Sequence, residues 1–302
     1  MASFLYERTL RRPVEGQGVG LHSGAEVAFR LLPAAPGTGI VFVRRDPSAR
    51  GGRDGVEIPA GLEYVQPAQY ATVLAANGAS VGTVEHLLST AAGLGIDNLR
   101  VELWGPEVPI FDGSAKPYVA FFREGGVETH GVPRRVLVPQ KPLSFRLNGS
   151  RLALHASSKM RISYTIDFPG TMVSHQELSL VLTPETYEKE IAPARTFGFA
   201  RDVEAMRRSG HIRGATLESA ILVGEEGIVN GTLRFPDEFV RHKILDAIGD
   251  FALIGKPWRG HFTASKAGHQ AHTLALKEWL ADPEAFAIEE TTEEDAALSQ
   301  LA

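Results

Sequence analysis

The chain has 302 residues, of which 22% are charged, and its formal net charge at pH 7 is −5. This length suits one large domain or two ordinary ones. The sequence contains no long basic cluster, so we expect no nucleic-acid partner. Cysteine is absent, which excludes disulfides and thiolate ligands, so a zinc site here must use histidine and carboxylate.

Two further features bear on where the protein works. No apolar run approaches the length of a bilayer span, so we expect no integral membrane segment. Residues 1–8 lack the apolar core of a signal peptide. We therefore predict a cytoplasmic protein.

The first half of the chain runs from strands to a helix. Residues 16–24 form a glycine-rich turn region of a predicted hairpin, and Val27, Phe29 and Leu31 alternate after it as in a half-buried strand. The glycines suggest a dinucleotide loop, but that loop needs a helix to follow, and the period of two argues against one. Apolar residues at helical spacing predict a helix over residues 83–94, ended by glycines. Further expected elements are strands at 41–43 and 98–103 and a short helix at 118–123.

The second half repeats this order after a candidate linker at residues 125–135, which is rich in glycine. Further strands are expected at 144–147, 152–155 and 161–168, and helices at 184–190 and 202–209. The clearest helix covers residues 238–253, with a wide apolar surface. We therefore predict two α+β halves of similar plan, packed face to face, with domains at 1–128 and 129–281. Residues 282–302 are acidic without Lys or Arg, which predicts a solvated, mobile tail.

Two motifs carry groups suited to metal chemistry. His242 and Asp246 stand four residues apart on the predicted helix, so both lie on one face, close enough to hold one metal ion. His86 offers a third ligand, and Glu85 beside it is an acid that need not bind metal. These are the parts of a hydrolytic zinc site with an open position for water. The alternative is a buried ion-pair network, which Asp250 extends along the same face.

Two other polar residues have more than one interpretation. His269 follows a glycine, so it is either a turn residue or an acid that faces a cleft. Thr196 lends a hydroxyl to a site or caps a turn. Glu85 itself needs no function at the start of a helix, where an acidic side chain is favoured by the helix dipole.

Six stretches of the sequence resemble the family of UDP-3-O-acyl-N-acetylglucosamine deacetylases, zinc enzymes that commit bacteria to lipid A synthesis. In chain order the stretches are GVGLHSG at 18–24, TVEHLLS at 83–89, GLGIDN at 93–98, PIFDGSA at 109–115, ARTFGF at 194–199 and FVRHKILDAIGD at 239–250. They follow the family's order and several are long and specific. The resemblance implies an α+β fold of two similarly built two-layer α/β sandwich domains, packed against each other with the active site between them.

The resemblance also implies roles for individual residues. His86, His242 and Asp246 match the family's zinc ligands, and Fe²⁺ is an alternative metal at such a site. Glu85 matches the general base and His269 the general acid.

Other positions match groups around the reacting carbonyl and the substrate. Lys243 and Thr196 match groups near the carbonyl, and Asp250 matches the acid that pairs with the catalytic histidine. The positions where the family contacts the UDP-sugar are Phe168, Asp202 and Lys266. The residues expected to line an acyl passage, for which core packing is the alternative, are Phe197, Phe199, Val203, Ile212 and Leu217.

The implied reaction is zinc-dependent hydrolysis of the N-acetyl group of UDP-3-O-acyl-N-acetylglucosamine, giving UDP-3-O-acyl-glucosamine and acetate. One alternative is a zinc amidohydrolase that acts on another acylated amino sugar. Another is a non-catalytic sugar-nucleotide binder with a structural metal. Glu85 and His269 argue against the binder, because a structural zinc takes four protein ligands and needs no base. We expect the protein to be a monomer.

The chain departs from the family pattern at positions that concern substrate fit. Ala215 stands within residues 214–216, where family members usually carry Gly-Gly-Ser. After the catalytic histidine family members usually show Leu-Asn, whereas this chain has Gln270, Ala271 and His272. These departures leave the metal ligands and the acid–base pair unchanged.

Overall fold

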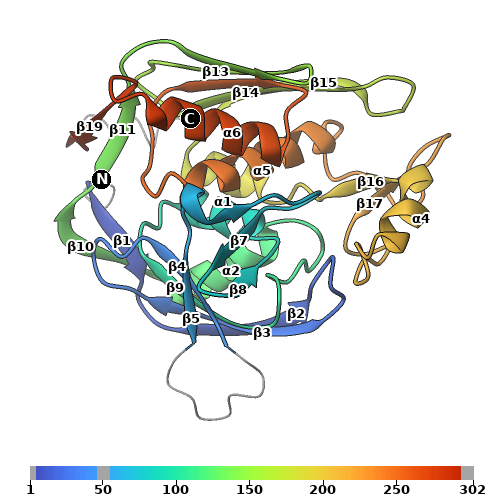
Figure 1. The fold of residues 1–302 in the computed structure, drawn as a ribbon, viewed down its shortest axis with the longest axis horizontal. Helices are drawn as coiled ribbons and strands as arrows, with labels where there is room; N and C mark the ends of the chain where they lie inside the picture. The colour runs from blue at the N-terminus through green and yellow to red at the C-terminus, as the bar shows by residue number, and fades with distance from the viewer. Residues whose placement is uncertain (1–4, 46–54, 294–302) are drawn as a thin grey trace.

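The computed structural model describes residues 5–45 and 55–293. Two five-stranded sheets form its outer layers, and four helices lie between them (Figure 1). The strands of the first sheet are β2 (Val14–Val19), β3 (Glu26–Pro33), β4 (Ile40–Arg44), β5 (Val56–Pro59) and β9 (Leu99–Trp104). The strands of the second sheet are β12 (Leu143–Leu147), β13 (Ser150–His155), β14 (Arg161–Phe168), β15 (Ser174–Val181) and β18 (His261–Ser265).

The two sheets share one topology. Their strand orders are β2-β3-β9-β4-β5 and β12-β13-β18-β14-β15. In each sheet the last strand along the chain lies at the centre, antiparallel to one neighbour and parallel to the other. Helices precede and follow each central strand, and these helices are α1 (Glu85–Leu94), α2 (Lys116–Gly125), α5 (Glu238–Ala252) and α6 (His269–Ala281). The expectation of two similarly built α/β halves is therefore confirmed.

A short two-stranded ladder closes each half. Strand β1 (Tyr6–Leu10) pairs with β10 (Val127–Pro133), and β11 (Arg135–Pro139) pairs with β19 (Phe286–Glu290). The predicted boundary between residues 128 and 129 falls inside β10. The segment predicted as a linker is therefore mostly paired strand, because its backbone groups find partners on β1 and β19.

The prediction of a mobile tail over residues 282–302 is corrected in its first part. Strand β19 pairs antiparallel with β11 along its whole length, and Glu289 forms an ion pair with Arg259. The acidic composition favoured a solvated segment, but the backbone ladder and the half-buried Phe286 hold this strand in place. Residues 294–302 lie outside the described part of the chain.

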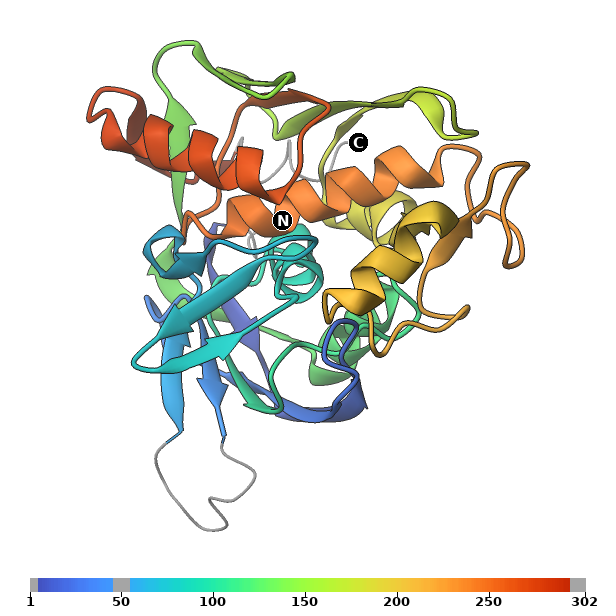
Figure 2. The ribbon, with the colours of Figure 1, turned by 45° about the vertical axis from the view of Figure 1, so that its right-hand side comes forward.

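Smaller elements surround this framework. In the first half they are η2 (Leu62–Tyr64), β6 (Val65–Gln66), β7 (Val73–Ala76) and β8 (Ala79–Val81), the strands forming one small sheet. In the second half they are α3 (Pro184–Thr186), η3 (Tyr187–Ile191), β16 (Phe197–Phe199), α4 (Ala200–Arg208) and β17 (Ile221–Val223). The segment from β16 to β17, here called the insert, extends from the side of the molecule (Figures 1 and 2).

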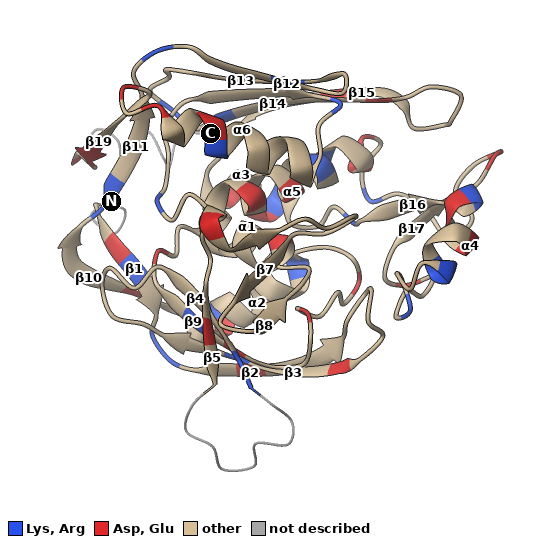
Figure 3. Cartoon of the chain, in the orientation of Figure 1, with Lys and Arg blue, Asp and Glu red and all other residues tan. Residues whose placement is uncertain are grey.

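The core forms where the sheets meet the helices. Val27, Phe29 and Leu31 alternate on β3 and are buried, as the period of two predicts. Helices α1 and α5 pack against each other at the centre of the molecule. Acidic positions nevertheless occur on both of these helices between the two sheets, and α5 also carries basic positions (Figure 3). Among the described residues, no helix is long and apolar enough to span a bilayer.

Candidate active site

One face of α5 carries three ionisable side chains. His242, Asp246 and Asp250 follow one another at four-residue spacing, and all three are buried. The start of this helix is fixed by Glu238, which has no solvent exposure and accepts hydrogen bonds from Arg195 Nε at 2.8 Å and from an Arg195 terminal nitrogen at 3.1 Å. This buried ion pair fixes the first turn of α5. It thereby also fixes the direction of the helix face that carries His242, Asp246 and Asp250.

A separate hydrogen-bond cluster fixes the start of α1. Thr83 has φ of +56°, which is strained for a β-branched residue, and its hydroxyl donates to the Glu107 carboxylate at 2.8 Å. Glu107 also accepts from the Ser23 amide at 2.6 Å. A Cβ on Gly20 would lie 2.2 Å from a Glu107 oxygen, so a side chain there would displace this carboxylate. Our sequence reasoning missed Glu107, which holds the strained turn in front of α1.

Gly249 brings the two helices together. A Cβ at this position would lie 2.1 Å from the carbonyl oxygen of Glu85, on the first turn of α1. The absence of a side chain therefore lets α5 approach the backbone of Glu85 closely. This approach places Glu85 and His86 opposite the polar face of α5.

Three ligand atoms converge between α1 and α5. Asp246 Oδ1 lies 3.3 Å from His242 Nε2 and 3.9 Å from His86 Nε2. Burial lowers the pKa of His242, and burial together with the neighbouring His242 lowers the pKa of His86 to about 3. Both imidazoles are therefore neutral at pH 7. His242 Nδ1 lies 3.1 Å from the Ala194 carbonyl, which only accepts hydrogen bonds, so the proton is on Nδ1 and the Nε2 lone pair faces Asp246.

This geometry fits a metal ion. A lone pair that faces a carboxylate is unfavourable unless a cation lies between them. Ligand atoms about 2.0–2.1 Å from a tetrahedral zinc stand about 3.3 Å apart, close to the separations seen here. Burial alone would raise the pKa of Asp246, but the charge of Lys243 and the neighbouring histidines hold it well below its usual value. The residues therefore supply one carboxylate and two neutral imidazoles, which is a three-ligand set with room for a fourth.

A carboxylate and a histidine face this metal-ligand set. Burial, with the charges of Asp246 and Asp250, raises the pKa of Glu85 to about 7. Burial would lower the pKa of His269, but the charge and hydrogen bond of Asp250 raise it to about 9. His269 Nδ1 donates to Asp250 Oδ2 at 2.8 Å, which leaves Nε2 directed toward Asp246 at 3.9 Å. Near pH 8 the site thus holds an ionised carboxylate and a protonated imidazole.

A cavity of about 560 Å³ contains nearly all the residues predicted from the sequence. The predicted metal-binding and catalytic residues that line it are Glu85, His86, Thr196, His242, Lys243, Asp246 and His269. The predicted substrate-contacting residues that line it are Phe168, Phe197, Phe199, Asp202, Val203, Ile212 and Leu217. Ala215 lines the same cavity. The apolar members come mainly from the insert, so the insert forms the apolar side of the cavity.

Two predicted residues do not line the cavity. Asp250 has no solvent exposure and lies behind His269. Lys266 follows β18 and forms an ion pair with Asp167 at 2.6 Å, next in the chain to the cavity-lining Phe168. The structure thus places Asp250 in support of another side chain and Lys266 beside the cavity.

Thr196 and Lys243 line the same cavity as the metal-ligand set. The Thr196 amide donates to the Gly113 carbonyl at 2.7 Å. Gly113 has φ of +83°, and a Cβ there would lie 2.2 Å from the Ser219 carbonyl, so this turn requires glycine. Lys243 Nζ donates to Asp246 Oδ2 at 2.6 Å. The two residues therefore present a hydroxyl and an ammonium group to the same cavity.

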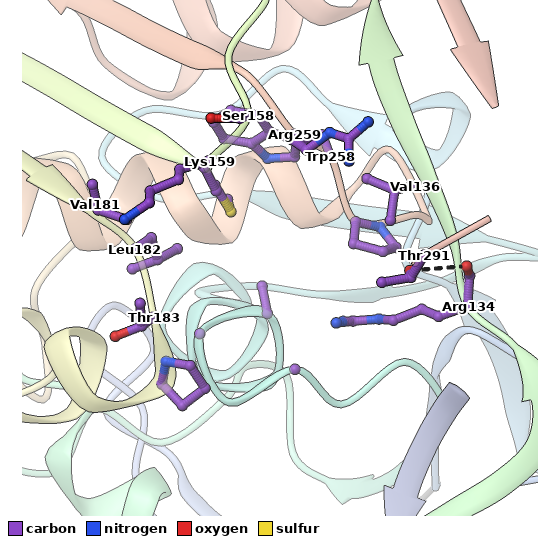
Figure 4. A pocket seen from close by; sticks show the side chains of 16 residues that line it. Arg134, Val136, Ser158, Lys159, Val181, Leu182, Thr183, Trp258, Arg259 and Thr291 are labelled. Atoms are coloured by element: carbon purple, nitrogen blue, oxygen red, sulfur yellow. Dashed lines mark hydrogen bonds between the residues drawn. The ribbon is translucent and has the colours of Figure 1, made fainter. Parts of the chain in front are cut away.

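A second, smaller cavity of about 110 Å³ lies at the C-terminal end of α1 (Figure 4). Arg134, Lys159 and Arg259 are among its lining residues, but no residue of the predicted site is. Arg134 is paired with Asp97 at 2.7 Å, and Arg259 is paired with Glu289. The charges of the two arginines in this cavity are therefore balanced by carboxylates of the protein.

Comparison with known proteins finds one family along nearly the whole chain. A family model for UDP-3-O-acyl N-acetylglycosamine deacetylase matches residues 7–281. The UDP-3-O-acyl-N-acetylglucosamine deacetylase of Myxococcus xanthus (strain DK1622) is 48% identical over 283 residues, which cover 93% of this chain and 88% of the relative. Relatives of the same name from Solibacter usitatus (strain Ellin6076) and Anaeromyxobacter sp. (strain Fw109-5) are each 43% identical. They cover 94% and 92% of this chain, and 94% and 89% of their own lengths.

Proposed function

The chain belongs to the UDP-3-O-acyl N-acetylglycosamine deacetylase family, and from this premise we propose how its residues carry out the reaction. The protein is a hydrolase that acts on the N-acetyl amide of UDP-3-O-acyl-N-acetylglucosamine in lipid A biosynthesis. The products are UDP-3-O-acyl-glucosamine and acetate.

We assign the catalytic metal to His86, His242 and Asp246, and we propose that it is zinc. The supporting observation is that two neutral imidazoles direct nitrogen atoms at the buried carboxylate of Asp246. Beside them lie Glu85, whose pKa is about 7, and His269, whose pKa is about 9. Zinc held by these residues would supply a water whose pKa is about 7 and would polarise a bound carbonyl. Fe²⁺ suits the same ligands, and elemental analysis of protein purified without added metal distinguishes the two.

Glu85 is the general base in this proposal. It is not needed as a ligand, and its pKa of about 7 suits proton removal from water near neutral pH. The water oxygen bonds to the acetyl carbon while its proton passes to Glu85. The developing oxyanion then receives hydrogen bonds from the Lys243 ammonium and the Thr196 hydroxyl.

His269 is the general acid. Because its pKa is raised to about 9, it is a cation at neutral pH and carries the proton that the leaving amine needs. When the carbon–nitrogen bond breaks, Nε2 gives this proton to the amine nitrogen. Each of the two proton transfers is worth about 10² to 10⁴ in rate.

The insert provides the binding site for the acyl chain in this proposal. Phe168, Phe197 and Phe199 form one aromatic cluster, with ring centroids 5.3–6.2 Å apart. Val203, Ile212 and Leu217 continue this apolar lining of the cavity. We propose that the UDP-sugar binds toward Phe168, Asp202 and Lys266. Assays over a series of acyl lengths test the assignment of the apolar side.

Substitution of Glu85 by Gln tests the assignment of the base. The change keeps the shape of the side chain and touches no metal ligand, so bound metal should stay at the wild-type level. We expect the acetate release rate to fall by about 10² to 10⁴. Unchanged turnover with metal retained would exclude Glu85 as the base.

Two alternatives have distinct outcomes. A metal amidohydrolase for another acylated amino sugar would act on free acylated glucosamines and not on the UDP-linked substrate. A sugar-nucleotide binder would bind UDP-sugar without releasing acetate. The monomeric state and the cytoplasmic location stay predictions, which size measurement in solution and cell fractionation can test.

A further inference from the structure

Asp250 accepts hydrogen bonds from three side chains, although the proposed reaction involves only one of them. The three donors are Thr72, from the loop before β7, and His269 and His272, which both lie on α6. We propose that Thr72 and His272 are positioning residues, which lock the carboxylate of Asp250 and thereby aim His269 at the leaving amine. This inference rests on the proposed function of His269 as general acid.

Thr72 connects the two halves of the protein. Its hydroxyl donates to Asp250 Oδ1 at 2.6 Å, across 178 residues of sequence. Its amide donates to Glu85 Oε2 at 3.0 Å, and its carbonyl accepts from the Val84 amide at 3.4 Å. The side chain is 3% exposed. Thr72 therefore holds one carboxylate oxygen of Glu85, the proposed base, and one carboxylate oxygen of Asp250, which supports the proposed acid His269.

The Thr72 hydroxyl also lies 3.3 Å from His269 Nδ1. That nitrogen already donates a hydrogen bond to Asp250 Oδ2, at the shorter distance of 2.8 Å. A hydroxyl has one proton to donate, and the charged oxygen at 2.6 Å is the stronger acceptor. Thr72 therefore acts on His269 through Asp250.

His272 holds the other carboxylate oxygen. It lies one turn after His269 on α6, is fully buried, and its Nδ1 lies 2.7 Å from Asp250 Oδ2. Because a carboxylate at this contact accepts, Nδ1 carries the proton. The other ring nitrogen lies 3.0 Å from the Tyr164 hydroxyl, which fixes the plane of the ring. Asp250 Oδ2 is thus shared between two histidines, one that faces the cavity and one that does not.

These contacts remove the rotational freedom of Asp250. With Oδ1 held by Thr72 and Oδ2 held by His272, the carboxylate keeps one orientation, and the ring of His269 follows it. Loss of either donor frees the carboxylate to turn. A misplacement of about 1 Å at a reacting group costs on the order of 10² in rate. Since His269 itself would still be present, we expect losses of about 10-fold to 100-fold, below the full contribution of a general acid.

Paired substitutions separate positioning from packing. Thr72→Val keeps the shape but removes the hydroxyl, whereas Thr72→Ser keeps the hydroxyl. His272→Leu removes the donor, whereas His272→Asn retains an N–H that can reach Asp250. A control, Thr183→Val, removes a hydroxyl that is equally buried but lies beside the second cavity, away from Asp250.

The experiment measures acetate release at saturating and limiting substrate, with metal content and thermal unfolding of each variant. We expect Thr72→Val and His272→Leu to lower kcat about 10-fold to 100-fold with KM and metal unchanged. The Ser and Asn variants should recover kcat to within about threefold, and Thr183→Val should lose stability without losing kcat.

Three results would overturn the proposal. The first is wild-type kcat in both donor-free variants. The second is failure of both conservative variants to recover kcat although they unfold at the wild-type temperature. The third is absence of acetate release from the wild-type protein, which removes the proposed function itself and this inference with it. Thr72 and His272 lie in separate parts of the fold, so each pair of variants tests the proposal by itself. If Thr72→Val does not fold, His272→Leu and His272→Asn give the test, and the reverse holds if His272→Leu does not fold.

Discussion

A single methyl group at Gly249 should separate catalysis from stability. The Cβ of an alanine there would lie 2.1 Å from the Glu85 carbonyl oxygen and 2.9 Å from its Cα. Ordinary contact begins at 3.4 Å, so the backbone of Glu85 must retreat by about 1.3 Å, the difference between the two oxygen distances. The retreat moves the start of α1, which carries the proposed base and the first metal ligand.

The expected loss of activity exceeds the expected loss of stability. A shift of about 1 Å in a catalytic group costs on the order of 10² in rate, which equals about 2.7 kcal/mol of activation free energy. An extra methyl group in a packed interface lowers the unfolding free energy by about 1–3 kcal/mol. Alanine regains about 1 kcal/mol over glycine in a helix interior. The net loss of unfolding free energy should therefore be about 0–2 kcal/mol.

Gly93→Ala provides the matched control. Gly93 lies on α1, the helix that Gly249 of α5 contacts, and a Cβ there would lie 2.3 Å from the ring of Tyr187, away from the active-site cavity. Acetate release at saturating substrate and urea unfolding are measured on both variants. We expect Gly249→Ala to lose about 10² in kcat and Gly93→Ala to lose stability alone. Wild-type kcat in Gly249→Ala, with normal folding, would refute the claim that this helix contact positions Glu85.

Three further predictions concern pH, metal and core. The value of kcat/KM should rise as Glu85 loses its proton near pH 7 and fall as His269 loses its proton near pH 9, and a flat profile from about pH 5 to 10 contradicts both assignments. Asp246→Ala should abolish metal binding in elemental analysis, because two histidines alone leave the site one ligand short; full metal content would exclude Asp246 as a ligand. Phe251→Ala should lower the unfolding free energy by about 3–5 kcal/mol in urea with kcat little changed, because its buried ring packs 4.4 Å from that of Phe262; a loss below about 1 kcal/mol would contradict this packing.

Local patterns in the sequence predicted much of the site. The spacing of His242, Asp246 and Asp250 places them on one face of a helix whatever the rest of the chain does. The pairing of this face with His86 needed the family resemblance, because periodicity says nothing about which helices pack together. The structure adds the physical reason, which is the close approach that Gly249 permits.

Long-range polar contacts could not be predicted in this way. Thr72 lies in a segment without clear periodicity, and its partner Asp250 is 178 residues away. Glu107 likewise acts on the strained Thr83 through a contact that no local pattern indicates. His272 gave a weak signal, since the sequence showed it as a departure from the family pattern without showing what it contacts.

The sequence predicted the two similar halves of the fold. It did not predict the two-stranded ladders β1–β10 and β11–β19. The order of strands and helices repeats in the two halves, which indicated similar domains. Composition misled at residues 286–290, because acidic side chains tolerate a strand whose backbone groups are paired at the edge of a domain. The partner strand β11 lies about 150 residues earlier in the chain, so a local pattern could not reveal the pairing.

The most direct test of the central claim is acetate release from UDP-3-O-acyl-N-acetylglucosamine by the purified protein, before chelation, after chelation and after zinc is restored. The account predicts release that disappears with the metal and returns with it, because it assigns the catalytic metal to His86, His242 and Asp246. No release from the metal-loaded protein over several acyl lengths would contradict the account. The alternative of a metal amidohydrolase with another acylated amino sugar as substrate would then be favoured.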